Sequence, residues 1–267
     1  MRKIMKALGL AEYGGDEMLI ALLACGSAAY ALALVHPALA VIPLIPLGIV
    51  VWFFRDPERS GTDDPEIMLS PADGRVSDIE EVDEPNFIRG KAKRIGIFLS
   101  PFNVHVNRTP CEGTVRHITY KAGEFLPAYN PEAPTRNECV SLGLELEGGL
   151  RVMVRQVTGI LARRIICQTD YGAQLKRGQR YGMIKFGSRT ELYVPIEQFA
   201  ECLVKIGDNV VGGTTPLCKV NLTVPKAPHD QPEQMVFSGE AMLSGDVALA
   251  EKRLSAEAAA IEASDNH

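Results

Sequence analysis

The chain has 267 residues, of which 46% are hydrophobic and 23% are charged, a composition that supports a packed core and excludes global disorder. Its formal net charge of -5 at pH 7, without a compact basic stripe, gives no electrostatic basis for a nucleic-acid partner. The six cysteines include no C-x-x-C pair; this excludes a zinc ribbon or thioredoxin-like motif and favours reduced, buried thiols.

Two long uncharged runs follow a short polar N-terminus. Residues 18–35 and 38–54 contain no charged side chain, and each run is about as long as one membrane crossing requires, roughly 17–25 residues. Buried core helices usually keep a polar face, and neither run has one. The two runs therefore predict a membrane-associated helical hairpin, and Pro43 and Pro46 leave a re-entrant form open beside a spanning one.

The flanks of this hairpin predict its orientation. Basic residues stand at both outer ends: Arg2, Lys3, Lys6, Arg55 and Arg59. The positive-inside tendency then places both ends, and the rest of the chain, on the cytoplasmic side of the cell membrane. Trp52, Phe53 and Phe54 stand where an interfacial aromatic anchor is expected.

The character of the sequence changes after the hairpin. Residues 55–65 are a polar linker with Pro and Gly, which marks a domain boundary, and short strand-like runs separated by turn signals follow. Strands are expected near residues 75–82, 94–99, 113–120, 139–147, 150–157, 163–166, 181–186, 190–194 and 216–222. A brief helix is expected within residues 196–204. This pattern predicts a mainly β, α+β fold with a β-sandwich or barrel-like catalytic domain.

The predicted organisation has three parts. They are a membrane-associating hairpin and linker at residues 1–60, a catalytic β domain at 61–225 and a C-terminal tail at 226–267. The tail contains an Ala- and Glu-rich stretch that is compatible with a short helix.

A glycine-turn pattern at residues 204–217 is similar to that of biotinyl and lipoyl domains, with Gly207 and Gly212 at the turns. It predicts biotinyl/lipoyl-like halves within the β domain and leaves a carrier or binding module open as an alternative function. Such a carrier needs a lysine at a hairpin tip. Leu243 stands where the biotin signature has that lysine, which argues against the alternative.

Three stretches combine strand ends with polar residues: SPADGRV from Ser70, FLSPFNVHVNRTP from Phe98 and KFGSRTE from Lys185. Locally, Asp73-Gly74 is a common turn dipeptide, and a single histidine such as His105 is usually a satisfied core or surface residue. The Gly187-Ser188 pair also suggests a turn by itself. Strand-forming residues on both sides of the pair would, however, hold its peptide bond with little freedom.

Two other kinds of site have less support. The order Asp73, His105, Ser188 is compatible with a serine hydrolase, but no G-x-S-x-G elbow surrounds the serine. The five histidines show no paired ligand spacing, so no metal is predicted.

Taken together, the apolar N-terminus and the motifs SPADG, SPFNVHVNRxP and GMIKFGSR resemble the phosphatidylserine decarboxylase family, in particular its shorter prokaryotic branch. The resemblance covers roughly residues 40–222. It implies conversion of phosphatidylserine to phosphatidylethanolamine and carbon dioxide by a covalent pyruvoyl group, without a metal. A pyruvoyl-dependent decarboxylase of another amine stays open, although it would not explain the two apolar runs.

In this family the pyruvoyl group arises by self-cleavage before the serine of a Gly-Ser pair. The resemblance therefore implies a cut between Gly187 and Ser188, which would give chains 1–187 and 188–267 that remain together as a heterodimer. A homo-oligomer would also suit the family. Because glycine lacks a Cβ atom, the hydroxyl of Ser188 can approach the carbonyl of Gly187 closely.

The resemblance also implies roles for single residues. Ser188 would supply the pyruvoyl group, which binds the substrate amine as an imine; His105 would protonate the α-carbon, and Asp73 would orient or charge-stabilise the site. Many members have a second histidine and an aspartate where this chain has Arg108 and Asn103. Arginine cannot act as a base, so the base for self-cleavage stays open between His105, assisted by Asp73, and other groups. Arg108 and Asn103 are predicted to bind the substrate, Arg108 through its carboxylate or phosphate.

Overall fold

The computed structural model describes residues 2–128, 130, 132–160, 164–185, 188–223 and 236–238. Gly187 and Leu243 lie outside these residues, as does the predicted C-terminal tail apart from residues 236–238. The elements up to Phe237 belong to one compact unit, Met1–Phe237, and Ser238–His267 forms a second.

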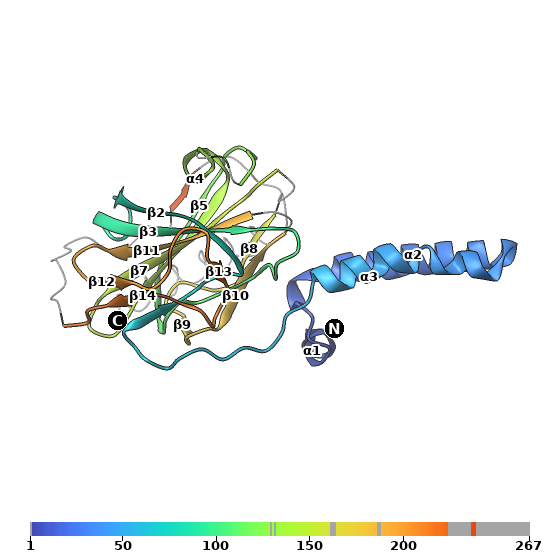
Figure 1. The fold of residues 1–267 in the computed structure, drawn as a ribbon, viewed down its shortest axis with the longest axis horizontal. Coiled ribbons are helices and arrows are strands. Elements are labelled where there is room, and N and C mark those ends of the chain that lie inside the picture. The colour runs from blue at the N-terminus through green and yellow to red at the C-terminus, as the bar shows by residue number, and fades with distance from the viewer. Residues whose placement is uncertain are drawn as a thin grey trace, which may run out of the picture. The chain divides into compact units, whose positions relative to one another are not determined.

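The N-terminal region is helical, as its apolar runs predict. Its elements are α1 (Arg2–Ala7), a 3-10 turn η1 (Glu12–Gly14), α2 (Gly15–Val35), a second 3-10 turn η2 (Pro37–Val41) and α3 (Leu44–Phe53). Helices α2 and α3 lie side by side (Figure 1). α2 ends before His36, whose backbone is extended (φ -159°, ψ 126°) because a following proline disfavours the helical conformation.

The side chains of α2 and α3 are mostly exposed. Tyr30 is 71% exposed, Leu34 74% and Ile45 62%, which would be unusual for a water-soluble surface. Within the described residues, one helix, Glu12–Val35, is long and apolar enough to cross a membrane. α3 has ten residues, about 15 Å of helix, and is shorter than a bilayer core. The apolar helix indicates that the protein associates with a membrane.

Backbone hydrogen bonds join the two ends of the helix pair. The amide of Ala11 donates to the carbonyl of Phe54 (2.7 Å), and the amide of Asp56 donates to the carbonyl of Gly9 (2.7 Å). The segments that enter and leave the hairpin therefore lie next to each other, as the sequence predicts.

The remainder is built of strands. They are β1 (Ile67–Leu69), β2 (Gly74–Glu84), β3 (Gly90–Leu99), β4 (Val106–Arg108), β5 (Gly113–Lys121), β6 (Cys139–Glu145), β7 (Arg151–Val157), β8 (Ile165–Cys167), β9 (Gln174–Leu175), β10 (Arg180–Ile184), β11 (Ser188–Pro195), β12 (Phe199–Cys202), β13 (Asn209–Val210), β14 (Pro216–Val220) and β15 (Val236–Ser238). A short helix, α4 (Ala133–Arg136), interrupts the connection between β5 and β6.

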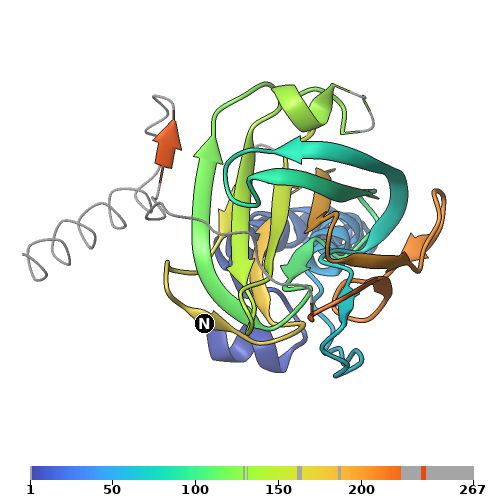
Figure 2. The ribbon, with the colours of Figure 1, turned by 90° about the vertical axis from the view of Figure 1, so that its left-hand side faces the viewer.

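The largest sheet has the strand order β13-β2-β3-β11-β7-β6-β5-β15, and β9 also pairs with β5. It curls around an apolar interior (Figure 2) in which Ile97, Val154 and Leu192 are fully buried. Two three-stranded sheets, β1-β14-β12 and β4-β10-β8, complete the fold. This curled, mainly β architecture with an apolar helical N-terminus confirms the predicted fold class.

β11 is an internal strand of the large sheet. It pairs antiparallel with β3 from Ser188 opposite Leu99 to Pro195 opposite Ala92, and with β7 on its other side. The strand that begins at Ser188 is therefore hydrogen-bonded to a neighbour along both edges.

One predicted element is wrong. Residues 196–204 contain the strand β12, and the brief helix expected there is absent from them. Phe199 and Cys202 pair with Val220 and Cys218 of β14. Pairing with β14 overrides the weak local preference of this segment. All six cysteines are free thiols.

Candidate active site

Two connections meet at one end of β3 and β11. Ser188 pairs with Leu99, and Met183 pairs with Val106, so both ends of the connection from Leu99 to Val106 have a partner in residues 183–188. Where they approach, the amide of Ile184 donates to the carbonyl of His105 (3.3 Å). The register of two strand pairs thus brings the second and third sequence motifs together.

Ser188 is fully buried at the start of β11. Its hydroxyl oxygen has no hydrogen-bond partner among the described residues. A buried hydroxyl without any partner costs about 1–3 kcal/mol, and such groups often occur at reactive sites. A buried hydroxyl with no partner among the described residues makes Ser188 a candidate for a reactive group.

His105 is also fully buried, and its ring packs on Phe53 with 4.6 Å between ring centroids. Its Nδ1 lies 2.9 Å from the carbonyl oxygen of Asn103. Because a carbonyl can only accept, Nδ1 carries the hydrogen, and the neutral ring has its lone pair on Nε2. This tautomer gives His105 a basic atom on the side of the ring away from Asn103.

The surroundings of His105 keep it neutral. Burial lowers its pKa to about 4, and the charge of Arg55 acts in the same direction. The hydrogen bond with Asn103 and the charge of Asp73 oppose this shift. At neutral pH the imidazole is therefore unprotonated and can accept a proton.

Asn103 organises the turn before His105. Its Oδ1 accepts hydrogen bonds from the backbone amide of Ser100 (2.9 Å) and from the Ser100 hydroxyl (2.8 Å). Since a backbone amide can only donate, these contacts fix which end of the Asn103 side chain is the oxygen. The amide nitrogen Nδ2 is then directed elsewhere as a donor.

Asp73 is held by groups from distant segments. Both terminal nitrogens of Arg59 donate to its carboxylate, with 2.8 Å between Nη2 and Oδ2, and the amide of Gly212 donates to Oδ1 (2.8 Å). The next residue must be glycine: Gly74 has φ +156°, and a Cβ there would lie 2.2 Å from the carbonyl oxygen of Phe98. This close approach places Asp73 beside the end of β3.

Arg108 is buried and engaged with the linker. Its Nη2 donates to Asp56 Oδ1 (2.9 Å) and to the carbonyl of Pro57 (2.9 Å), and its Nη1 donates to the carbonyl of Gly178 (3.2 Å). Burial lowers the pKa of Arg108, and Asp56 opposes this. These contacts tie the linker to β4, and substrate binding by Arg108 stays a prediction.

The end of the hairpin that adjoins the β domain forms part of this region, which the sequence did not predict. Lys185 pairs with the carboxylate of Glu17 at the start of α2, and its Nζ lies 5.8 Å from the ring centroid of Phe54. Phe53 and Phe54 are buried, so the expectation that they anchor at the membrane interface with Trp52 is wrong. No local pattern distinguishes these two aromatics from Trp52; the contact with His105 and Lys185 does.

Arg189, the residue after Ser188, belongs to a separate ionic cluster. Its Nη1 and Nη2 donate to the two oxygens of Asp78 (2.5 and 2.8 Å), and its Nε donates to Glu191 (2.7 Å). Burial alone would lower the pKa of Arg189, but the two carboxylates outweigh burial and raise it.

Comparison with known proteins gives a consistent result. A family model described as phosphatidylserine decarboxylase matches residues 47–218. A phosphatidylserine decarboxylase proenzyme of Symbiobacterium thermophilum is 47% identical over 181 residues, which cover 68% of this chain and 83% of the relative. One from Carboxydothermus hydrogenoformans is 44% identical, covering 70% of this chain and 87% of the relative. One from Rhodopirellula baltica is also 44% identical, covering 66% and 74%.

Proposed function

This chain belongs to the phosphatidylserine decarboxylase family, and we propose that it removes carbon dioxide from phosphatidylserine, leaving phosphatidylethanolamine, with a pyruvoyl group made from Ser188. The observation that carries the proposal is the fully buried hydroxyl of Ser188, which has no hydrogen-bond partner among the described residues. The proenzyme names of the relatives agree with activation by cleavage.

The proposed maturation uses groups of the chain itself. The hydroxyl oxygen of Ser188 attacks the carbonyl carbon of Gly187, and its proton passes to Nε2 of His105. The amide nitrogen of Ser188 takes up a proton as its bond to Gly187 breaks, which leaves an ester. Loss of the α-proton of Ser188 then expels Gly187 as a carboxylate. Water replaces the nitrogen on the remaining alkene carbon, and ammonia leaves.

His105 supports this maturation as its base. Its lowered pKa of about 4 means that the ring is unprotonated at neutral pH, and the bond from Nδ1 to Asn103 orients the lone pair on Nε2. Asp73 contributes a negative charge that stabilises the protonated ring once the proton has moved. We therefore propose His105, assisted by Asp73, as the base that the sequence leaves open.

Once formed, the pyruvoyl group supplies a conjugated carbonyl that accepts the electron pair of the departing carbon dioxide. The chain positions the substrate around it. We propose that Nδ2 of Asn103 donates to an anionic oxygen of the substrate, because Ser100 already holds Oδ1. Nε2 of His105 takes a proton when the substrate amine is deprotonated and returns one to the α-carbon. Substrate binding by Arg108 stays a prediction, since its guanidinium already pairs with Asp56.

Cleavage would leave a heterodimer of chains 1–187 and 188–267 at the membrane. The small chain would start with β11, which pairs with β3 and β7 of the large chain. The basic residues at both ends of the hairpin favour a cytoplasmic position for the catalytic part. In this proposal the catalytic β domain spans residues 61–225.

Intact mass combined with denaturing electrophoresis tests the maturation. The wild type should give chains of 187 and 80 residues, the shorter with a blocked N-terminus, whereas Ser188→Ala should stay whole at 29.1 kDa. Ser141→Ala is a matched control, because Ser141 is also buried in the large sheet but contacts Arg155; it should be cut normally. Wild-type protein that is uncut yet active would refute the maturation.

Carbon dioxide release tests the substrate. The cut protein should release carbon dioxide from phosphatidylserine in mixed micelles and not from free serine. Equal rates on the two would contradict a lipid substrate and favour another amine.

A further inference from the structure

Phe102 is an exposed aromatic residue within the second motif. Its side chain is 73% exposed, although it stands next to Asn103, whose carbonyl orients His105. Turns at a water-facing surface usually carry small or polar residues at such positions. The exposure of Phe102, in the loop that leads to the buried His105, therefore needs an explanation.

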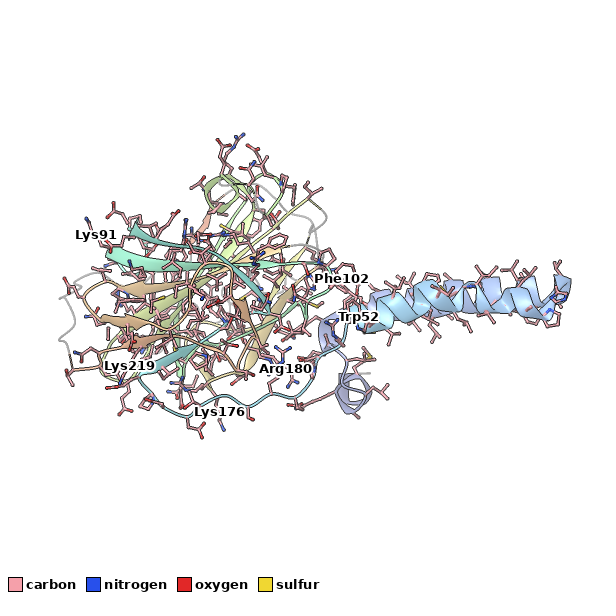
Figure 3. The ribbon with its side chains drawn as sticks, viewed as in Figure 1. Trp52, Lys91, Phe102, Lys176, Arg180 and Lys219 are labelled. Carbon is pink, nitrogen blue, oxygen red and sulfur yellow. The ribbon has the colours of Figure 1, made fainter. Side chains whose placement is uncertain are left out.

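Phe102 adjoins the end of helix α3. Its ring centroid lies 6.1 Å from that of Trp52, which is 42% exposed, and Figure 3 shows the two side chains together where α3 reaches the β domain. The apolar surface of α2 and α3 therefore continues onto loop 100–104 of the catalytic region, which gives that loop the same expected surroundings as the helix end.

Arg55 completes this surface. Its guanidinium carbon lies 3.9 Å from the centroid of the Trp52 ring, and its Nη2 donates to the carbonyl of Phe102 (2.7 Å). A tryptophan with an arginine guanidinium over its ring belongs to the groups found at the headgroup level of a bilayer, and phenylalanine is among the apolar side chains that enter the boundary between headgroups and acyl chains. A cation at that level also attracts anionic lipid.

We propose that Phe102 inserts into the headgroup region of an anionic bilayer, as a membrane contact that the catalytic domain adds to those of α2 and α3. The occupant of the surface formed by Trp52, Arg55 and Phe102 is thus the bilayer. Insertion would fix the turn that ends at Asn103 and hold His105 at the level where lipid headgroups lie. The proposal rests on the proposed function for its substrate, a membrane lipid.

Fluorescence quenching tests the position of residue 102. Trp52 is the single tryptophan of the chain, so Trp52→Phe/Phe102→Trp carries one probe in the loop. In vesicles of phosphatidylcholine and phosphatidylserine with brominated acyl chains, this tryptophan should be quenched at least twofold more than the probe of Trp52→Phe/Tyr171→Trp. Tyr171 is an exposed aromatic in the turn after β8. Equal quenching at the two positions would overturn the proposal.

A kinetic comparison separates membrane contact from a role inside the site. Phe102→Ser should be cut like the wild type, and its turnover of detergent-dispersed phosphatidylserine should be within about twofold of the wild-type rate. Its turnover on vesicles should fall about tenfold, as expected when an aromatic side chain that inserts into the bilayer is lost. Tyr171→Ser should be unchanged in both assays. An equal fall of Phe102→Ser in micelles and vesicles would contradict the proposal.

These results are distinguishable from failure of the proposed function. Uncut, inactive wild-type protein would refute the decarboxylase proposal, while the quenching difference between positions 102 and 171 would still decide whether Phe102 enters the bilayer.

Discussion

Ser188 and Arg189 are neighbours on β11, and because side chains alternate along a strand they face opposite sides of the sheet. The hydroxyl of Ser188 is buried without a hydrogen-bond partner among the described residues. Arg189 donates to Ser77, Asp78 and Glu191. Among the described residues, one face of the strand thus leaves the hydroxyl of Ser188 without a partner, and the other gives every side-chain nitrogen of Arg189 an acceptor. The first arrangement suits a group that must react, and the second suits a group that holds segments of the chain together. We call the side of β11 that carries Ser188 the reacting face and the side that carries Arg189 the holding face.

The holding face links the two proposed chains. Asp78 lies on β2, before the proposed cut, and Arg189 lies just after it. Glu191, which is fully buried, also accepts a hydrogen bond from the hydroxyl of Tyr193 (2.6 Å). Burial alone would raise the pKa of Asp78, but its contact with Arg189 lowers it. Asp78 and Arg189 therefore keep their charges at neutral pH, and their ion pair joins the small chain to the large one independently of the backbone.

The largest expected effect is on the reacting face. Replacing His105 by Gln removes the proposed base and should slow self-cleavage by about 10²–10⁴-fold. Time courses of intact mass after cell-free synthesis would measure this rate. His117→Gln is the matched control, because His117 is also a buried histidine, stacked on Phe87; its cleavage should be normal. Cleavage of His105→Gln at the wild-type rate would remove His105 from the proposed maturation.

The next effect is on the holding face. Arg189→Met leaves the carboxylates of Asp78 and Glu191 without their main partner, and breaking a buried pair costs about 3–5 kcal/mol of unfolding free energy. Urea unfolding in a Ser188→Ala background, which keeps the chain whole, would measure this loss.

Lys93→Met is the control for the holding face. Lys93 is on the adjacent strand β3 and pairs with the exposed Glu81 (3.1 Å), a surface pair worth about 1 kcal/mol or less. If Arg189→Met and Lys93→Met destabilised the protein equally, the ionic cluster around Glu191 would not stabilise the fold more than a surface ion pair does.

A third effect is the pH dependence that the buried histidine imposes. Because burial lowers the pKa of His105 to about 4, the unfolded chain binds a proton on this residue more readily than the folded chain between about pH 6.5 and 4. Stability is therefore fully present above pH 6.5 and is lost as the pH falls, by about 2 kcal/mol between pH 7.5 and 5. Urea midpoints of Ser188→Ala and Ser188→Ala/His105→Phe would measure this. Equal slopes in the two would contradict the assignment.

The sequence predicted the six long strands of the large sheet, because their apolar residues recur with turn signals between them, but it did not predict the short strands β9, β13 and β15. It also brought Ser188, His105 and Asp73 forward as candidates through their motifs. It did not predict the partners of Arg189, since the contact with Asp78 depends on strands β2 and β11 lying on the two sides of β3. Registers between distant strands decide such contacts, and local composition does not reveal them.

The hairpin base illustrates the same limit. Phe53 and Phe54 continue an apolar run, and by composition they resemble Trp52. Only the fold separates them, by placing Phe53 against His105 and Phe54 near Lys185. A run that predicts membrane association can therefore also end in residues that line the candidate active site, because burial against the β domain satisfies the same apolar side chains.

The smallest expected effect concerns Asn103, which lies between the two kinds of residue compared above: its oxygen is satisfied by Ser100, and its Nδ2 is proposed to bind substrate. Asn103→Ala loses both functions and should slow self-cleavage about threefold to tenfold, since each lost hydrogen bond is worth about 1 kcal/mol. Asn103→Asp keeps the acceptor for Ser100 but lacks the donor. It should be cut almost normally and show a raised KM for phosphatidylserine in micelles. If Asn103→Asp kept the wild-type KM, Asn103 would be an organiser of the turn alone, and the substrate contact would have to come from another group.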